Sequence, residues 1–166
     1  MSKAFLRESD VEPEPTVVRP VLLAPGAKRY LTEAGAERLH EELNRLRTVE
    51  RPALAGAAAD LDAKRELRKL DERARELQQI LATAEIISSP APDRSIVRFG
   101  AKVTVKEEDG TTSTYRIVGI DETEFYTGGI SFQSPLAQAL LGASVGDRIQ
   151  FQSPAGPRQL EIQLIE

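Results

Sequence analysis

Two carboxylates, Asp60 and Asp62, flank Leu61 in the segment AAADLDAK, residues 57–64, and are the residues best placed for chemistry in this chain. Carboxylate oxygens suit Mg²⁺, an ion that proteins usually hold with only one or two of their own groups. Two acids on one loop could therefore share a divalent cation with a second protein. The alternative is that both belong to an ordinary solvated helix terminus, with Asp62 capping the helix that follows.

Composition excludes most other kinds of site. The chain has no cysteine and a single histidine, His40, which excludes thiol catalysis, cysteine-ligated zinc and histidine-based triads. It also has no Gly-rich phosphate loop, no GxSxG segment and no HExxH segment. We therefore expect a protein that is not an enzyme, has no catalytic residue and holds no metal or cofactor of its own.

The charge of the chain favours a protein partner. Its formal net charge is −4, whereas tight binding to a nucleic-acid backbone needs clustered lysines and arginines. One basic cluster, KRELRK at residues 64–69, follows the two acids. Because Glu66, Asp71 and Glu72 lie within or beside it, we interpret it as a solvated helix face.

The first 29 residues combine prolines and mixed charges without helical or strand periodicity, which predicts a disordered or extended leader. The opening residues MSKAFLRESD lack the apolar core of a secretory signal, and no apolar run is long enough to span a membrane. We expect a cytoplasmic protein without membrane contact.

The acids lie between two runs that have the spacing of a helical hairpin. Apolar residues recur at alternating intervals of three and four, the pattern of one helix face turned toward a partner helix. In the second run these are Leu67, Leu70, Ala74, Leu77, Leu81 and Ala84; in the first they are Ala36, Leu39, Leu43 and Leu46, continued by Glu50, Ala53, Ala57 and Asp60. We predict an antiparallel coiled coil over residues 30–88 that narrows to a polar tip.

Further features refine this hairpin. Thr32 is placed to cap the first helix, and Pro52 should kink the first arm without ending it. Arms of about 25 residues would form a rod of about 40 Å, longer than a small domain needs for its own core. The rod is therefore either a reaching device or part of a four-helix bundle formed by dimerisation.

The sequence pattern of the C-terminal part of the chain predicts a small β domain. Residues 89–96 form a linker, and from residue 97 apolar and polar residues alternate with period two. A short helix is predicted after Ser134, which is a candidate N-cap. Pro135 occupies its first position and Gly142 ends it. Residues 97–166 are thus expected to form an antiparallel sheet with one short helix, giving an α+β chain.

Several motifs carry a family resemblance. They are VRFGAKVTV (97–105), TYRIVG (114–119), SPLAQALLG (134–142), VGD (145–147) and PAG (154–156), together with LTEAGAERLHEELNRL (31–46) and ERP (50–52) upstream. These segments resemble the GreA/GreB family of bacterial transcript cleavage factors over nearly everything from Tyr30 to the end. The resemblance implies a coiled coil joined to a C-terminal domain of FKBP-like fold. It also implies that this domain docks on RNA polymerase at its secondary channel while the hairpin reaches toward the active site.

The resemblance implies site residues as well. Gln133, Ser134, Pro135 and Leu136 match the polymerase-binding segment of the family, although relatives often have an acid or asparagine in place of the glutamine. Cleavage-promoting members carry a tip segment close to DLSENAEY, whose acids help the polymerase hold its second Mg²⁺. Here AAADLD runs directly into AKRELRKLDERA, without ENxEY and with shorter arms. Asp60 and Asp62 are thus the candidates for a shared contact with the polymerase's Mg²⁺.

We therefore expect a transcription elongation regulator that binds RNA polymerase as a monomer and meets nucleic acid only through the transcription complex. It could stimulate cleavage of backtracked RNA through its tip acids. The alternative is a regulator that does not promote cleavage and competes with other secondary-channel factors. Prolyl isomerase activity, which FKBP-like topology alone would suggest, is disfavoured because the chain lacks a pocket rich in tyrosine and tryptophan.

Overall fold

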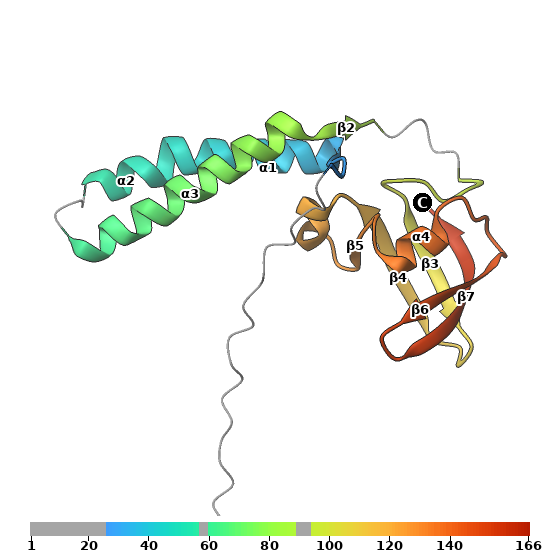
Figure 1. Ribbon diagram of the computed structural model, residues 1–166. Coiled ribbons are helices and arrows are strands. Elements are labelled where there is room, and N and C mark those ends of the chain that lie inside the picture. Colours follow the sequence, from blue (N-terminus) through green and yellow to red (C-terminus); the bar gives the residue numbers. More distant parts are fainter. Residues whose placement is uncertain (1–25, 57–59, 89–93) are drawn as a thin grey trace, which may run out of the picture.

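The computed structural model describes residues 26–56, 60–88 and 94–166. Most of the expected leader, residues 1–25, and most of the expected linker, residues 89–93, lie outside the described residues. The described chain forms a helical hairpin joined at its base to a β domain, and the hairpin projects away from that domain (Figure 1). The predicted α+β fold is confirmed.

The first arm of the hairpin consists of α1 (Glu33–Arg45), the π-helical turn η1 (Leu46–Glu50) and α2 (Arg51–Gly56). The second arm is α3 (Leu61–Thr83). Thr32 caps α1 as predicted, since its hydroxyl oxygen accepts a hydrogen bond from the backbone N–H of Gly35 at 3.0 Å. This bond satisfies one of the N–H groups that a helix start leaves unpaired.

The apolar seam between the arms follows the predicted spacing over most of its length. It forms one core whose buried residues are Leu31, Ala36, Leu39, Leu43 and Leu46 on the first side and Leu70, Ala74, Leu77 and Ile80 on the second. At the end of α3 the prediction is less accurate: Ile80 is buried, while Leu81 and Ala84 are only partly buried. The seam residues thus hold the arms together near the base more than near the tip.

The irregularity expected near Pro52 is the π-helical turn that precedes it. The backbone N–H of Arg51 donates to the carbonyl of Leu46, five residues back, so this turn contains one residue more than an α-helical turn. The helix then continues past Pro52 to Gly56. The extra residue moves the seam by one position, so that Leu54 packs on the hairpin core while Ala53 is exposed.

This shifted register predicts a difference between two apolar residues of the first arm. Leu54→Ala should lower the free energy of unfolding by about 1 kcal/mol, because a half-buried side chain loses its packing. Val49→Ala should change it by less than about 0.5 kcal/mol, because Val49 is 61% exposed. Urea titration followed by circular dichroism measures both; equal effects would contradict the shifted seam.

The second helix ends earlier than predicted, at Thr83, and the residues after it form strand β2 (Glu85–Ile87). This strand pairs in parallel with β1 (Tyr30–Thr32), the strand that leads into α1. The backbone N–H of Glu85 also donates to the carbonyl of Arg29 at 2.8 Å. The base of the hairpin is therefore closed by strand pairing, which helical periodicity did not reveal.

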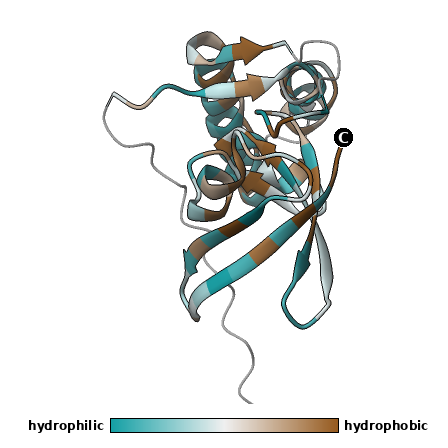
Figure 2. Ribbon diagram, turned by 90° about the vertical axis from the view of Figure 1, so that its right-hand side faces the viewer, coloured by the Kyte–Doolittle hydropathy of each residue, from teal (hydrophilic) through white to brown (hydrophobic). Residues whose placement is uncertain are grey.

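The β domain is a five-stranded sheet in the order β5-β4-β3-β7-β6. Its strands are β3 (Lys102–Glu107), β4 (Thr112–Val118), β5 (Gly129–Ser131), β6 (Arg148–Ser153) and β7 (Gly156–Ile165). Hydrophobic and hydrophilic residues alternate along β6 and β7, as Figure 2 shows, so that one face of these strands contributes to the core.

One feature of the sheet differs from the prediction of an antiparallel domain. Strand β5 pairs with β4 in parallel, so the sheet is mixed. The reason is the 3₁₀ helix η2 (Ile120–Phe125), which the sequence analysis did not predict and which lies between the two strands. This connection lets the chain re-enter the sheet in the same direction.

The short helix α4 (Pro135–Leu140) lies where the sequence predicts it and packs against β6. The hydroxyl oxygen of Ser134 accepts a hydrogen bond from the N–H of Ala137 at 3.2 Å, which is the predicted cap. Gly142 ends the helical region with φ of 81°, a conformation that favours glycine. Ala137 and Leu140 anchor the helix in the domain core.

Candidate functional site

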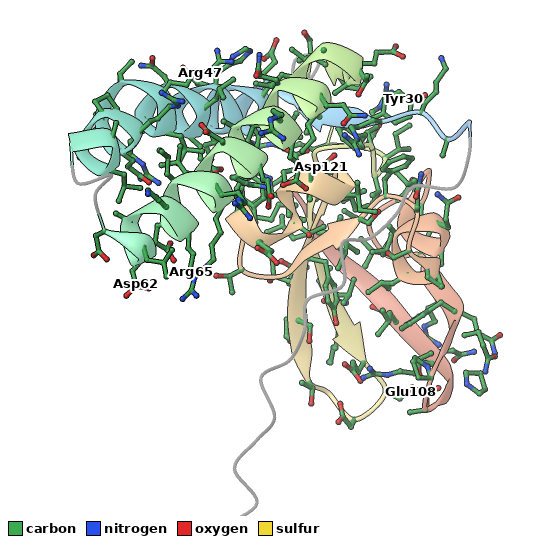
Figure 3. The ribbon with its side chains drawn as sticks, turned by 60° about the vertical axis from the view of Figure 1, so that its left-hand side comes forward. Tyr30, Arg47, Asp62, Arg65, Glu108 and Asp121 are labelled. Atoms are coloured by element: carbon green, nitrogen blue, oxygen red, sulfur yellow. The ribbon has the colours of Figure 1, made fainter. Side chains whose placement is uncertain are left out.

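The tip of the hairpin presents both predicted acids to solvent. Asp60 is the N-cap of α3, with one carboxylate oxygen accepting from the N–H of Asp62 at 3.2 Å. The cap is thus Asp60, and the expectation that Asp62 would fill this role is wrong. Asp62 lies in the first turn, where its carboxylate accepts from the guanidinium of Arg65 at 3.4 Å. Figure 3 shows Asp62 and Arg65 at the tip, far from Tyr30 at the hairpin base.

The residues just after the tip form the solvated basic face that the sequence predicts. The ammonium of Lys69 donates to Glu66 at 2.8 Å, and this hydrogen bond raises the pKa of Lys69. Within residues 26–56, 60–88 and 94–166, no group of three or more histidines, cysteines and acids could hold a metal ion. Asp60 and Asp62 would therefore need ligands from a partner to bind a cation.

Ion pairs brace the middle of the hairpin. The guanidinium of Arg73 donates to Glu42 on the opposite arm at 2.8 Å and to Glu76 at 2.8 Å. The bond to Glu42 contributes most to raising the pKa of Arg73. Arg51 and Asp71 form a second link between the arms at 2.8 Å. The Arg73–Glu42 pair lies alongside the leucine core, and the Arg51–Asp71 pair lies at the end of that core nearer the tip.

The predicted docking segment, Gln133–Leu136, consists of the turn before α4 and the first two residues of that helix. Its residues differ in what they can offer a partner: Gln133 and Pro135 are exposed, whereas Leu136 packs against the domain core. The hydroxyl of Ser134 is already engaged in capping α4. Gln133 and Pro135 are therefore the side chains of this segment that remain available for contact.

The docking segment lies next to the base of the hairpin. Phe132, the residue before Gln133, packs its ring edge-on against Tyr30 of β1, with 5.2 Å between the centroids. Phe99 completes the cluster, at 5.7 Å from Phe132 and 6.2 Å from Tyr30. The structure thus brings together the start of the hairpin and the docking segment, two regions about a hundred residues apart in the sequence.

Glu122 of η2 joins the two parts of the molecule and is fully buried. One of its carboxylate oxygens accepts from the backbone N–H groups of Thr32 at 2.9 Å and Gly119 at 2.8 Å. The other accepts from the hydroxyl of Thr32 at 2.7 Å. The cap residue of α1 and the end of β4 are thus tied to one carboxylate.

Two more polar contacts cross the same junction. Arg29 and Asp121 form an ion pair at 3.1 Å, and burial raises the pKa of the Asp121 carboxyl while the arginine opposes that shift. Arg38 of α1 donates to the carbonyl of Phe125 at 2.9 Å and lies over the rings of Phe125 and Tyr126. The sequence analysis missed this junction, because its members are distant in the chain and become neighbours only in the folded molecule.

No helix among the described residues is long and apolar enough to cross a membrane. Comparison with protein families finds a match between residues 91–166 and the family model described as transcription elongation factor, GreA/GreB, C-term.

Individual relatives match over most of the chain. The transcription elongation factor GreA of Alkalilimnicola ehrlichii is 38% identical over 151 positions, covering 82% of this chain and 96% of the relative. That of Chloroflexus aggregans is 40% identical over 147 positions, covering 80% and 94%. Since 82% of 166 residues is about 136, about 15 of the 151 positions in the first alignment have no residue in this chain.

Solved structures with detectable similarity include GreA factor homolog 1 (Gfh1) of Thermus thermophilus. It is 26% identical, with a TM-score of 0.40, and the match covers 84% of this chain and 99% of that one. Transcription elongation factor GreA/GreB from Nitrosomonas europaea is 20% identical, with a TM-score of 0.40, covering 84% and 98%.

Proposed function

This chain belongs to the GreA/GreB family of transcription elongation factors, and on that premise we propose that it acts by docking on RNA polymerase and inserting its hairpin into the secondary channel. The observation that carries the proposal is the projecting hairpin, whose tip presents two exposed acids (Figures 1 and 3). A slender rod suits a confined passage, and the compact sheet is the part that can anchor it.

The docking surface is the start of α4, with Gln133 and Pro135 as its contact residues. Both side chains are exposed, while the Ser134 cap and the core packing of Leu136 hold the segment against the domain. A preorganised segment loses little conformational freedom on binding, which favours affinity. The aromatic contact between Phe132 and Tyr30 fixes this segment beside the hairpin base, so that docking would also determine where the hairpin starts.

At the tip, Asp60 and Asp62 are the groups that would share the polymerase's Mg²⁺. Both are exposed, and two carboxylates can supply part of an octahedral shell whose remaining ligands come from the polymerase, RNA and water. The bound cation would lower the pKa of a ligated water and orient it for hydrolysis of RNA. Catalysis would remain the polymerase's, and this protein would be its activator, not an enzyme.

We propose as the alternative function that the protein occupies the channel without promoting cleavage, and the bonding of the two tip acids supports this alternative. Asp60 is engaged as a helix cap and Asp62 pairs with Arg65, so neither carboxylate is free of competing partners. If the missing positions are divided between the arms, each arm is about seven residues, or about 10 Å, shorter than in the relative. Magnesium ligands must lie within about 2.1 Å, so a deficit of this size would leave the acids out of reach.

Transcript cleavage by stalled, backtracked polymerase complexes distinguishes the two functions. If the acids assist cleavage, Asp62→Asn and Asp60→Ser should each slow factor-stimulated cleavage at least tenfold. Serine keeps a capping oxygen at position 60, which separates the loss of charge from the loss of the helix cap. Glu66→Ala, which removes an exposed acid from the second turn of α3, is the matched control and should leave the rate unchanged.

Other outcomes have equally definite meanings. If the wild-type protein binds core polymerase, fails to accelerate cleavage and slows cleavage stimulated by a GreA protein, the second function holds. If it does not bind core polymerase in a pull-down, both functions are wrong. In either function the protein would act in the cytoplasm as a monomer, would meet nucleic acid only within the transcription complex and would need no cofactor of its own.

A further inference from the structure

We propose that Glu122 is a positioning residue that sets the direction in which the hairpin leaves the β domain. Its carboxylate does not lie at the tip or in the docking segment, and it would touch neither RNA nor metal. It acts through Thr32, the residue from which the first arm starts. The consequence at the polymerase rests on the proposed function, but the orientation itself is a property of the free protein.

The bonding of Glu122 supports a positioning role. Three donors, the N–H and hydroxyl of Thr32 and the N–H of Gly119, converge on a side chain with no exposed surface. Hydrogen bonds to a charged acceptor are stronger than those between neutral groups, and a buried carboxylate left without them would be costly. The carboxylate also lies at the N-terminus of α1, where the helix dipole favours negative charge. The three hydrogen bonds, the burial of the carboxylate and the helix dipole all favour one placement of α1 against β4.

Steric fit adds to this restriction. A side chain at Gly35 would overlap the Glu122 carboxylate, and one at Gly119 would overlap the carbonyl oxygen of Tyr30. The hairpin base and the end of β4 therefore approach as closely as backbone atoms allow. Close contact of this kind leaves no room for the base to rotate while the carboxylate stays bonded.

The length of the hairpin makes the orientation of its base important, because a small rotation there moves the tip a long way. The 23 residues of α3 span about 34 Å, so a rotation of about 10° at the base would move the tip by about 6 Å. A displacement of that size exceeds the tolerance of any contact that the tip acids could make with a bound cation. The junction therefore determines whether a docked molecule delivers its tip to a defined place.

Distance measurement on the full-length free protein tests the proposal. The chain has no cysteine, so Lys64→Cys near the tip and Glu108→Cys in the turn between β3 and β4 (Figure 3) can carry a single pair of spin labels. The unmodified junction should give one narrow distance distribution. Glu122→Ala should at least double the width of this distance distribution. Glu122→Gln, which keeps an acceptor oxygen, should leave the distribution nearly as narrow as in the unmodified protein.

Two further variants make the experiment decisive. Glu124→Ala removes an exposed acid from the same 3₁₀ helix and should leave the distribution unchanged. Gly35→Ala displaces the Glu122 carboxylate from the hairpin side and should broaden it even if Glu122→Ala fails to fold. The proposal is overturned if a folded Glu122→Ala or Gly35→Ala protein keeps the narrow distribution, or if Glu124→Ala broadens it equally.

The polymerase assay then separates this inference from the proposed function. Glu122→Ala should bind core polymerase within about threefold of wild type, because the docking segment is intact, while its effect on transcript cleavage or on competing factors falls at least tenfold. An unchanged effect would overturn the positioning role. Failure of wild type to bind polymerase would reject the proposed function and leave the distance result standing.

Discussion

Leu77→Ala is expected to unfold the hairpin while the β domain keeps its structure. Leu77 has no exposed surface and lies in the centre of the seam, so its truncation should cost about 2–5 kcal/mol. For a unit of about 60 residues that corresponds to a fall in melting temperature of at least about 10 °C. The β domain should persist because its buried core residues are a separate set.

Two measurements check this expectation. Circular dichroism at 222 nm reports the helices, and amide hydrogen exchange in β7 reports the β domain; the first should change and the second should not. Leu61→Ala is the matched control, since this leucine of the same helix is 62% exposed and should contribute less than about 0.5 kcal/mol. Simultaneous loss of both signals in Leu77→Ala would mean that the two cores unfold as one cooperative unit.

The double variant Gln133→Ala/Pro135→Ala is expected to weaken binding to core polymerase about ten- to a hundredfold. A side chain at the centre of an interface typically contributes 1–2 kcal/mol or more, and these two are the exposed members of the docking segment. The free energy of unfolding should change little, since neither side chain is buried and the Ser134 cap remains.

The end of β6 and the turn after it offer a matched control for this variant. Gln152 and Pro154 are the same residue types, are also exposed and belong to the same domain. Gln152→Ala/Pro154→Ala should therefore bind polymerase as tightly as wild type in a fluorescence titration. Equal weakening by both double variants would show that the docking surface has been assigned to the wrong part of the domain.

The position of the two tip acids in the fold could be predicted from the sequence, but their contacts could not. Fading of the leucine spacing toward Asp60 was enough to place the acids at the tip, because apolar periodicity marks where two helices stop packing. Which acid caps α3 could not be read from spacing. Asp60 and Asp62 both lie within one turn of the helix start, and the extended backbone of Asp60 decides between them.

Much of the fold was likewise determined by local sequence. Helical spacing in Leu39 and Leu77, period-two alternation after residue 97 and the cap at Ser134 each reflect interactions between residues close in the chain, and each appears in the structure. The helix after Ser134 begins and ends where its cap and Gly142 indicate, because those signals act on their own backbone.

Only the tertiary structure decided the arrangements that depend on distant segments. The π-helical turn moves the apolar seam to Leu54. Strands β1 and β2, which precede and follow the hairpin in the sequence, pair at its base. The buried Glu122 accepts hydrogen bonds from both Thr32 and Gly119. In the sequence Glu122 is one acid among 26 acidic residues, because its three donors become neighbours only when the chain has folded. Sequence alone therefore determined a hairpin, a sheet and a family, whereas the direction of the hairpin follows from a carboxylate that only folding could bury.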